Sequence, residues 1–436
     1  NAQIYFVLIV FISLLILSFI NILRIISPEI LQNNVSFAFV MIAVISTSIC
    51  CIIARYLNVY FAPVLLATFL TACLIGTRPA IATTIFSILL NVLLLYGALE
   101  AYDTEIPQLI IANIISGIAV ISILRKSQKR QNILVAGTVA GFMHFIVILF
   151  FAIYGNANIK NSMVNAFVHL LSAYIAALLA MGAQPVFEYI FNMCSENKLL
   201  ELSNPDHPLL KRVLLKAPGT YQHSMMVANL SEAAAEVIGA NSLLVRVGAY
   251  YHDVGKTVHP EFFKENQSGE NIHNTMDSFE SAEIVIQHVD QGVKLAKQYR
   301  LPKQIREFIT THHGNSVVMY FYHEAKKTNP DKEIDINQFR YKHSKAKTKE
   351  QSIVMLADTV EAAVRTLKNK NPEIMLEFIH TLIDAKMQDK QLSESALTMH
   401  EIELVCESFV HTLEATYHER IVYPQIKLEE DNETTI

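Results

Sequence analysis

The first 198 residues are almost free of charge, and this feature restricts the fold more than any other. They hold 9 of the 35 Lys and Arg residues and 6 of the 40 Asp and Glu residues. A membrane-spanning helix needs ~20 predominantly apolar residues. Apolar runs of about this length, three of them slightly shorter, follow one another at about 4–26, 36–55, 58–75, 80–98, 106–124, 132–154 and 163–190. Residues 1–190 are therefore predicted to form a seven-span α-helical membrane domain.

The charges between the runs predict the orientation. The basic loop at 124–130 ("LRKSQKR") is expected in the cytoplasm because cytoplasmic loops are enriched in Lys and Arg, and the acidic loop at 100–105 ("EAYDTE") falls on the opposite side. Counting spans from there places residue 1 outside and residue 199 inside. Arg24 and Arg78 agree with this orientation, and Arg55 does not. Residue 1 is Asn rather than Met, so the chain is expected to be a fragment with room outside for an upstream domain.

Two histidines, His144 and His169, lie inside predicted spans. Ionisable groups at such positions often mark function. No acidic partner is visible in the sequence, so hydrogen bonding between helices is the favoured role.

The remainder of the chain has the composition of an ordinary globular domain. Residues 199–436 hold 26 Lys and Arg against 34 Asp and Glu, a net charge of −8, which argues against a broad DNA- or RNA-binding surface. Helical periodicity runs through it without the alternation typical of strands. It predicts a juxtamembrane helical linker over 191–206, an all-helical domain over 207–424 and a disordered acidic tail over 425–436. The five cysteines show no metal-type or redox pairing, so a reducing compartment is expected.

Residues of the metal-ligand type are distributed over several predicted helices of this second domain. His and carboxylate side chains together suit a divalent transition metal. A carboxylate can bridge two ions, and helices packed in a bundle can direct such groups into one cavity. Seven residues, enough for two ions, form the candidate set: His223, His252, Asp253, His288, His312, His313 and Asp358.

Most members of this set also have an ordinary structural interpretation. A single histidine such as His223 is more often a satisfied polar residue of an amphipathic helix, and His312 and His313 could be helix-end cations favoured by the helix dipole. Asp358 is different because it lies in the apolar run "IVMLADTV". A carboxylate buried there needs a partner or a metal, since burying it unpaired is costly.

The order of these residues resembles the H…HD…D pattern of the HD-domain phosphohydrolase superfamily, formed here by His223, His252-Asp253 and Asp358. The added His288 and His312-His313 resemble its binuclear branch. Within that branch, the HD-GYP cyclic-di-GMP phosphodiesterases have a G-Y-P element after the paired histidines, and "HHGNSVVMYFYHEA" lacks it. The PgpH-type seven-transmembrane HD family is more similar, over essentially the whole chain, through "HPLLKRVLLKAPGTYQHS", "GAYYHDVGK", "FFKENQ" and "TKEQSIVMLADTVEAAVR".

The resemblance implies a cyclic-di-AMP phosphodiesterase of the bacterial plasma membrane with a cytoplasmic HD domain. In that family an extracellular domain precedes the spans. Two divalent ions per chain, Mn²⁺ or Fe²⁺ with Zn²⁺ as the alternative, would share a hydroxide that opens the substrate to linear pApA. Carried over to this chain, Asp253 would bridge the ions, His223, His252 and Asp358 would complete one, and His288, His312 and His313 the other. Lys256 would hold the phosphate, and His273 is a weaker candidate for a substrate contact. Membrane lipid is a further expected partner, and a homo-oligomer is left open.

Other functions stay open at this point. An HD hydrolase of deoxynucleotides or guanosine tetraphosphate uses a single metal, so it would leave His288, His312 and His313 without a role. Cyclic-di-GMP is a third possible nucleotide. A non-catalytic nucleotide-binding membrane receptor would be favoured by a lost ligand, and none is lost. A transporter is disfavoured because the predicted spans contain so few charges.

Overall fold

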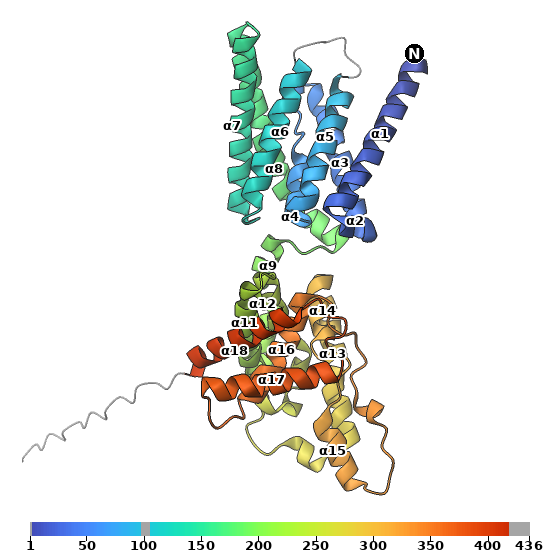
Figure 1. Ribbon diagram of the computed structural model, residues 1–436, viewed down its shortest axis with the longest axis vertical. Helices are drawn as coiled ribbons and strands as arrows, with labels where there is room; N and C mark the ends of the chain where they lie inside the picture. Colours follow the sequence, from blue (N-terminus) through green and yellow to red (C-terminus); the bar gives the residue numbers. More distant parts are fainter. Residues whose placement is uncertain (1, 97–104, 418–436) are drawn as a thin grey trace, which may run out of the picture. The chain divides into compact units, whose positions relative to one another are not determined.

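Helices account for nearly all regular structure in the described part of the chain. The computed structural model describes residues 2–96 and 105–417 (Figure 1). Apart from one isolated antiparallel bridge between Val317 and Arg340, no strand pairing occurs there. This confirms the all-α fold class. The predicted acidic tail, and the acidic loop apart from the first residue of α6, lie outside the described residues.

The chain divides into two compact units. The first comprises Asn1–Asn204 with Pro302–Gln304, and the second comprises Pro205–Leu301 with Ile305–Ile436. The predicted linker over 191–206 contains the end of the long helix α8 (Ile159–Phe191) and the short helix α9 (Glu196–Leu202). Glu196 of α9 accepts hydrogen bonds from the Ser127 hydroxyl (2.9 Å) and the Gln128 amide, so α9 is held to the basic loop.

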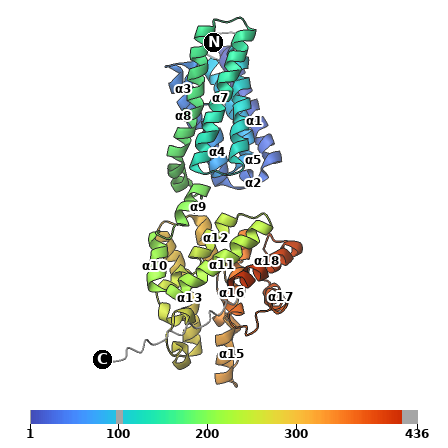
Figure 2. The ribbon, with the colours of Figure 1, turned by 90° about the vertical axis from the view of Figure 1, so that its left-hand side faces the viewer.

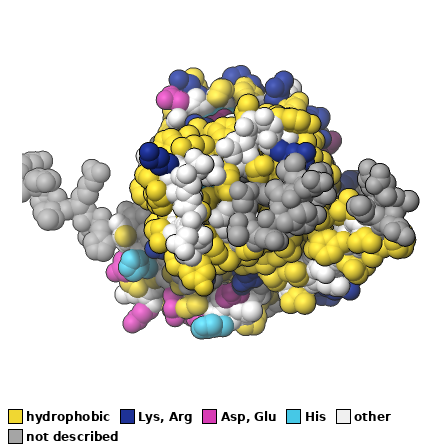
Figure 3. All heavy atoms as spheres, turned by 90° about the horizontal axis from the view of Figure 1, so that it is seen from above, with side chains coloured by type: hydrophobic (Ala, Val, Ile, Leu, Met, Phe, Trp, Pro, Cys, Tyr) yellow, Lys and Arg dark blue, Asp and Glu magenta, His cyan; other side chains and the backbone are white. Residues whose placement is uncertain are grey.

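Within the described residues of the first unit, six helices are long and apolar enough to cross a membrane. They lie side by side in Figures 1 and 2. Many of their outward-facing side chains are hydrophobic, and such side chains predominate on the face in Figure 3. The six helices are α1 (Ala2–Ile26), α3 (Asn34–Arg55), α5 (Thr77–Tyr96), α6 (Glu105–Leu124), α7 (Arg130–Tyr154) and α8, with a short α2 (Pro28–Gln32) between the first two.

The run at 58–75 does not form the continuous helix that its composition predicts. It contains a 3₁₀ turn, η1 (Val59–Phe61), and the nine-residue helix α4 (Leu66–Leu74). Pro63 separates them because proline lacks an amide donor and disfavours helix in the residue before it. A nine-residue helix is ~14 Å long, about half of a bilayer core. The described residues thus contain six helices of spanning length and one broken apolar segment.

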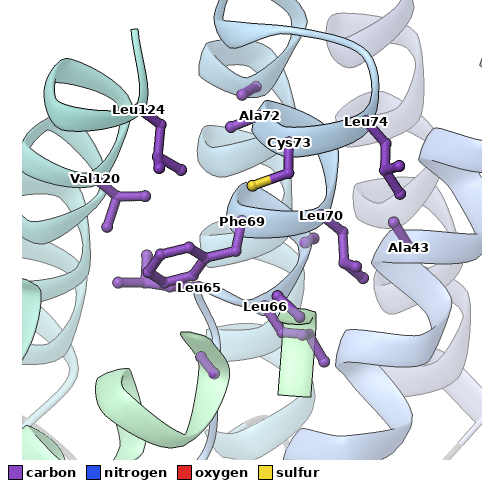
Figure 4. Close-up of a cluster of buried hydrophobic side chains, with 14 of the residues drawn as sticks. Ala43, Leu65, Leu66, Phe69, Leu70, Ala72, Cys73, Leu74, Val120 and Leu124 are labelled. Atoms are coloured by element: carbon purple, nitrogen blue, oxygen red, sulfur yellow. The ribbon is translucent and has the colours of Figure 1, made fainter. Parts of the chain in front are cut away.

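Residues 62–74 of the broken segment are buried among other parts of the first unit. Every residue of α4 is buried, and Figure 4 shows Leu65, Leu66 and Phe69 among side chains of neighbouring helices. Irregular backbone at membrane depth is stable only where other groups satisfy its polar atoms. Here the Ser87 hydroxyl donates to the Val64 carbonyl (3.3 Å).

The two intramembrane histidines make the interhelical hydrogen bonds expected of them. His169 Nδ1 donates to the Tyr60 carbonyl (2.9 Å), and His144 Nδ1 donates to the His169 carbonyl (3.2 Å). Their rings are stacked with centroids 3.8 Å apart. These contacts connect η1 to α8 and α8 to α7.

The second unit is a helical bundle arranged around α16. All residues of α16 from Gln351 to Asp358 are buried, as are Val360, Glu361 and Val364, and α16 packs against α11, α12 and α17. A capping box formed by Thr348 and Gln351 fixes its first turn. The helices after residue 204 are α10 (Pro208–Lys216), α11 (Pro218–Val237), α12 (Ser242–Tyr251), α13 (Ser278–Gln298), α14 (Lys303–Thr311), α15 (Met319–Thr328), α16 (Lys349–Val364), α17 (Pro372–Gln388) and α18 (Met399–Tyr417), with 3₁₀ turns η2 (Val254–Thr257), η3 (Pro260–Phe262), η4 (Lys264–Asn266), η5 (Ile272–Thr275) and η6 (Ile336–Phe339).

Candidate metal centre

The structure brings all seven predicted ligand residues together. Six of them are buried, and His313 is partly exposed. Several elements contribute one or two each: His223 lies on α11, His252 directly follows α12, Asp253 precedes η2, His288 lies on α13, His312 and His313 directly follow α14, and Asp358 lies on α16.

The glycine of "HDVGK" allows two of these elements to meet. A Cβ atom on Gly255 would lie 1.8 Å from the His288 carbonyl oxygen and 2.6 Å from the Gly292 amide nitrogen. Only a residue without a side chain lets η2 approach α13 this closely. The approach places His288 Nε2 3.3 Å from Asp253 Oδ1.

The first group of ligand atoms comes from His223, His252, Asp253 and Asp358, which can place one ligand atom each within 4.8 Å of the others. His223 Nε2 lies 3.0 Å from Asp358 Oδ1 and 3.6 Å from Asp253 Oδ2. His252 Nε2 lies 3.3 Å from Asp253 Oδ2 and 3.6 Å from Asp358 Oδ1. Two imidazoles and two carboxylates therefore converge on one point.

The second group consists of His288, His312 and His313. His288 Nε2 and His312 Nε2 face each other at 3.3 Å. On each ring, Nδ1 donates to a backbone carbonyl, Val285 for His288 (2.6 Å) and Ile309 for His312 (2.9 Å). In their neutral forms the two Nε2 atoms would then present lone pairs to each other, an arrangement that a cation between them stabilises.

Asp253 connects the two groups through its two oxygen atoms. Oδ2 faces His223 and His252, whereas Oδ1 lies 3.3 Å from His288 Nε2 and 3.5 Å from His312 Nε2. Asp253 is 1% exposed; Lys256 Nζ lies 2.7 Å from Oδ2, whereas Oδ1 accepts no hydrogen bond among the described residues. Buried carboxylate oxygens without hydrogen bonds are costly unless a cation is near. The residues present therefore fit divalent metal binding.

Backbone and side-chain acceptors fix the orientation of the first-group imidazoles as well. His252 Nδ1 donates to the Ala249 carbonyl (2.7 Å), one of the last carbonyls of α12. His223 Nδ1 donates to Glu361 Oε2 (2.5 Å), and Arg365 Nε donates to the other oxygen of Glu361 (2.6 Å). Each ring thus directs Nε2 toward the centre, and such outer partners orient metal ligands.

Glu361 is a residue that the analysis of the sequence missed. It is 1% exposed and lies three positions after Asp358 on the same face of α16. A second carboxylate in the apolar run "IVMLADTVEAAV" was the available signal, since it too needs a buried partner.

The two ligand groups differ in the protonation of their histidines. Burial alone would raise the pKa of Asp253, but Lys256 and His252 outweigh it and hold that pKa well below its ordinary value. For His252 burial acts in the lowering direction, but Asp253 and Asp358 raise the pKa to about 10. Burial dominates at His312 and lowers its pKa to about 4. Without metal, His252 of the first group therefore carries a proton that a metal must displace. His312 of the second group is already neutral and can bind a metal directly.

Lys256 lies beside this centre in a buried ion pair. Its Nζ is 2.7 Å from Asp253 Oδ2 and 3.0 Å from Glu265 Oε1. Burial would lower the pKa of Lys256, but the charges of Asp253 and Glu265 outweigh it and raise that pKa. Lys256 is therefore a permanent cation at the metal centre.

A cavity of about 760 Å³ opens next to the ligands, and His223, His313, Asp358 and Lys256 contribute to its wall. This is the volume range of small-molecule sites. Three further cations line it, Lys264, Arg365 and Lys386. His273 is not among its lining residues, and His273 Nε2 instead donates to the Phe262 carbonyl (2.8 Å).

A helical bundle that gathers His and Asp in this order is typical of HD-domain metal hydrolases, joined here to helices of membrane-spanning length. Residues 220–363 match the HD domain family, and residues 2–195 match the family described as "7TM receptor with intracellular HD hydrolase". The chain belongs to the family of PgpH-type seven-transmembrane HD proteins.

Two relatives are named cyclic-di-AMP phosphodiesterase PgpH. The protein of Bacillus subtilis is 37% identical over 376 residues, which cover 85% of this chain and 52% of the relative. The protein of Listeria monocytogenes is 40% identical over 318 residues, covering 72% and 44% respectively. The chain thus spans about half the length of these curated relatives. A crystal structure of the L. monocytogenes PgpH HD domain in complex with cyclic-di-AMP is 44% identical and covers 49% of this chain and 100% of that chain, with a TM-score of 0.47.

Proposed function

We propose that this protein hydrolyses cyclic-di-AMP to linear pApA at the His/Asp centre of its second unit. The observation that carries the proposal is the position of Asp253, whose two oxygens face two separate ligand groups. Relatives at 37% and 40% identity are named for this activity, which supports the choice of substrate.

Two divalent ions, Mn²⁺ or Fe²⁺, suit the donor set of imidazoles and carboxylates. One ion would be held by His223, His252 and Asp358, and the other would be held by His288, His312 and His313. Asp253 would contact both ions. When bound, such a pair activates water and neutralises charge on the phosphate oxygens.

The chain's own residues orient and hold the substrate. Lys256, Lys264, Arg365 and Lys386 provide positive charge along the cavity for a ligand with two phosphates. In the reaction, water oxygen bonds to phosphorus, the bond from phosphorus to the 3′-oxygen breaks, and that oxygen takes a proton. Glu361 and Arg365 keep His223 oriented during this step.

The basic loop at 124–130 supports an orientation with this loop and the catalytic unit in the cytoplasm, in reach of a soluble nucleotide. The first residue of the chain would then lie on the outer side.

Turnover of cyclic-di-AMP and cyclic-di-GMP by the purified full chain with Mn²⁺ or Fe²⁺ tests the proposal. Cyclic-di-AMP is expected to be cleaved faster, and Asp253→Ala is expected to abolish cleavage because it removes the buried carboxylate whose two oxygens face the two ligand groups. Asp331→Asn, an exposed carboxylate of the same unit, is the matched control and is expected to behave like the wild type. Preference for cyclic-di-GMP, or turnover by Asp253→Ala near that of the wild type, would refute the proposal.

A further inference from the structure

A groove of about 610 Å³ lies along the first unit, between the consecutive helices α5 and α6. It belongs to the membrane-spanning part and shares no residue with the cavity at the metal centre. One end of the groove is basic and polar, and the remainder is lined by isoleucine side chains and Thr84.

The basic end is formed by two arginines from different helices. Arg78 is the second residue of α5, and Arg125 directly follows the last residue of α6. Because α5 and α6 follow one another in opposite directions, these residues lie at the same end. Both line the groove and both are exposed. Among the described residues, neither guanidinium has a carboxylate partner within ion-pair distance.

Beyond the arginines, the wall of the groove is apolar and open to the surroundings. Ile81 and Ile85 of α5 are 40% and 41% exposed, and Ile114 and Ile118 of α6 are 39% and 61% exposed. The floor is closed where α6 approaches α5, since a Cβ on Gly117 would lie 2.6 Å from Thr84 Cγ2. In a bilayer such a surface contacts acyl chains rather than water.

We propose that this groove is a binding site for an anionic phospholipid of the phosphatidylglycerol class. Arginine matches phosphate with paired hydrogen bonds, so Arg78 and Arg125 would hold the headgroup. The isoleucines below them would contact one acyl chain. Two unpaired cations at one end of an apolar groove complement a lipid with net negative charge more than a zwitterionic one.

Binding is tested on the full chain in detergent micelles, with dioleoyl-phosphatidylglycerol as the probe and native mass spectrometry counting bound lipid. Arg78→Gln with Arg125→Gln is expected to weaken binding roughly 25-fold, about fivefold for each arginine. Arg24→Gln with Arg130→Gln is the matched control, because it removes the same charge from exposed residues outside the groove. The control is expected to bind like the wild type.

A second variant tests the apolar part without changing charge. Ile118→Trp fills the groove from a side chain that is 61% exposed and so is not required for packing. It is expected to reduce phosphatidylglycerol binding while both arginines remain. Unchanged binding in the double arginine variant, an equal loss in the control pair, or equally tight binding of dioleoyl-phosphatidylcholine by the wild type would each overturn the proposal. Since binding is counted directly, the result does not depend on phosphodiesterase activity.

Discussion

Glu361→Gln tests whether a residue outside the ligand set tunes the metal centre. The carboxylate is 1% exposed, accepts a hydrogen bond from His223 Nδ1 at 2.5 Å and is held by Arg365 Nε at 2.6 Å. Glutamine keeps the shape and an acceptor oxygen but removes the negative charge that increases the basicity of the imidazole. Loss of such an outer partner typically costs ~10–100-fold in metal affinity or activity.

The assay is a Mn²⁺ titration of cyclic-di-AMP hydrolysis, with thermal unfolding measured alongside. The half-saturating Mn²⁺ concentration is expected to rise ~10–100-fold, and turnover at saturating metal is expected to recover in large part. Glu377→Gln, an exposed glutamate on the neighbouring helix α17, is the matched control. A lower melting temperature with an unchanged Mn²⁺ dependence would refute this reasoning and leave Glu361 a purely structural residue.

Three further predictions concern packing, protonation and topology. Gly255→Ala is expected to destabilise the protein by ~1–3 kcal/mol in denaturant unfolding because its Cβ would meet the His288 carbonyl at 1.8 Å, whereas Gly269→Ala, with nothing within 4 Å, should be neutral. Since the pKa of His252 is raised to about 10 and that of His312 is lowered to about 4, acidification from about pH 9 to about pH 6 should release metal from the first group before the second, and equal loss from both would contradict this. Lys129→Cys should resist an impermeant thiol reagent added outside intact cells, and labelling there beyond the wild-type level would reverse the proposed orientation.

The seven candidate metal ligands could be predicted from the sequence, whereas the residues that orient them could not. Most of the ligands have an ordinary structural interpretation when taken singly, and it is the resemblance of their order to the HD pattern that groups them. Glu361 was missed because its partners, His223 and Arg365, are defined by a packing of α11 on α16 that spacing does not reveal. For His273, the polar loop around it predicts a substrate contact, and the structure shows that His273 Nε2 donates to the Phe262 carbonyl.

In the membrane-spanning unit, the sequence predicts the apolar segments but not their exact secondary structure. Apolar composition predicts where the chain enters a hydrophobic environment but not whether a segment is one helix. The run at 58–75 is as apolar as its neighbours, yet it breaks before Leu66. Its irregular backbone is stable because Ser87 and His169 from other helices supply hydrogen bonds. Such tertiary partners cannot be inferred from the composition of the run itself.

Asp358→Asn tests whether one carboxylate-linked centre holds two ions and cleaves a phosphodiester. Asp358 Oδ1 lies 3.0 Å from His223 Nε2 of the first ligand group, and its Oδ2 lies 3.7 Å from His313 Nδ1. The measurement is metal content per chain together with cyclic-di-AMP turnover, in the wild type and the variant. We expect two ions in the wild type, loss of the first-group ion with the second retained in the variant, and turnover reduced by at least ~10–100-fold. Two tightly held ions with unchanged turnover in Asp358→Asn would contradict it.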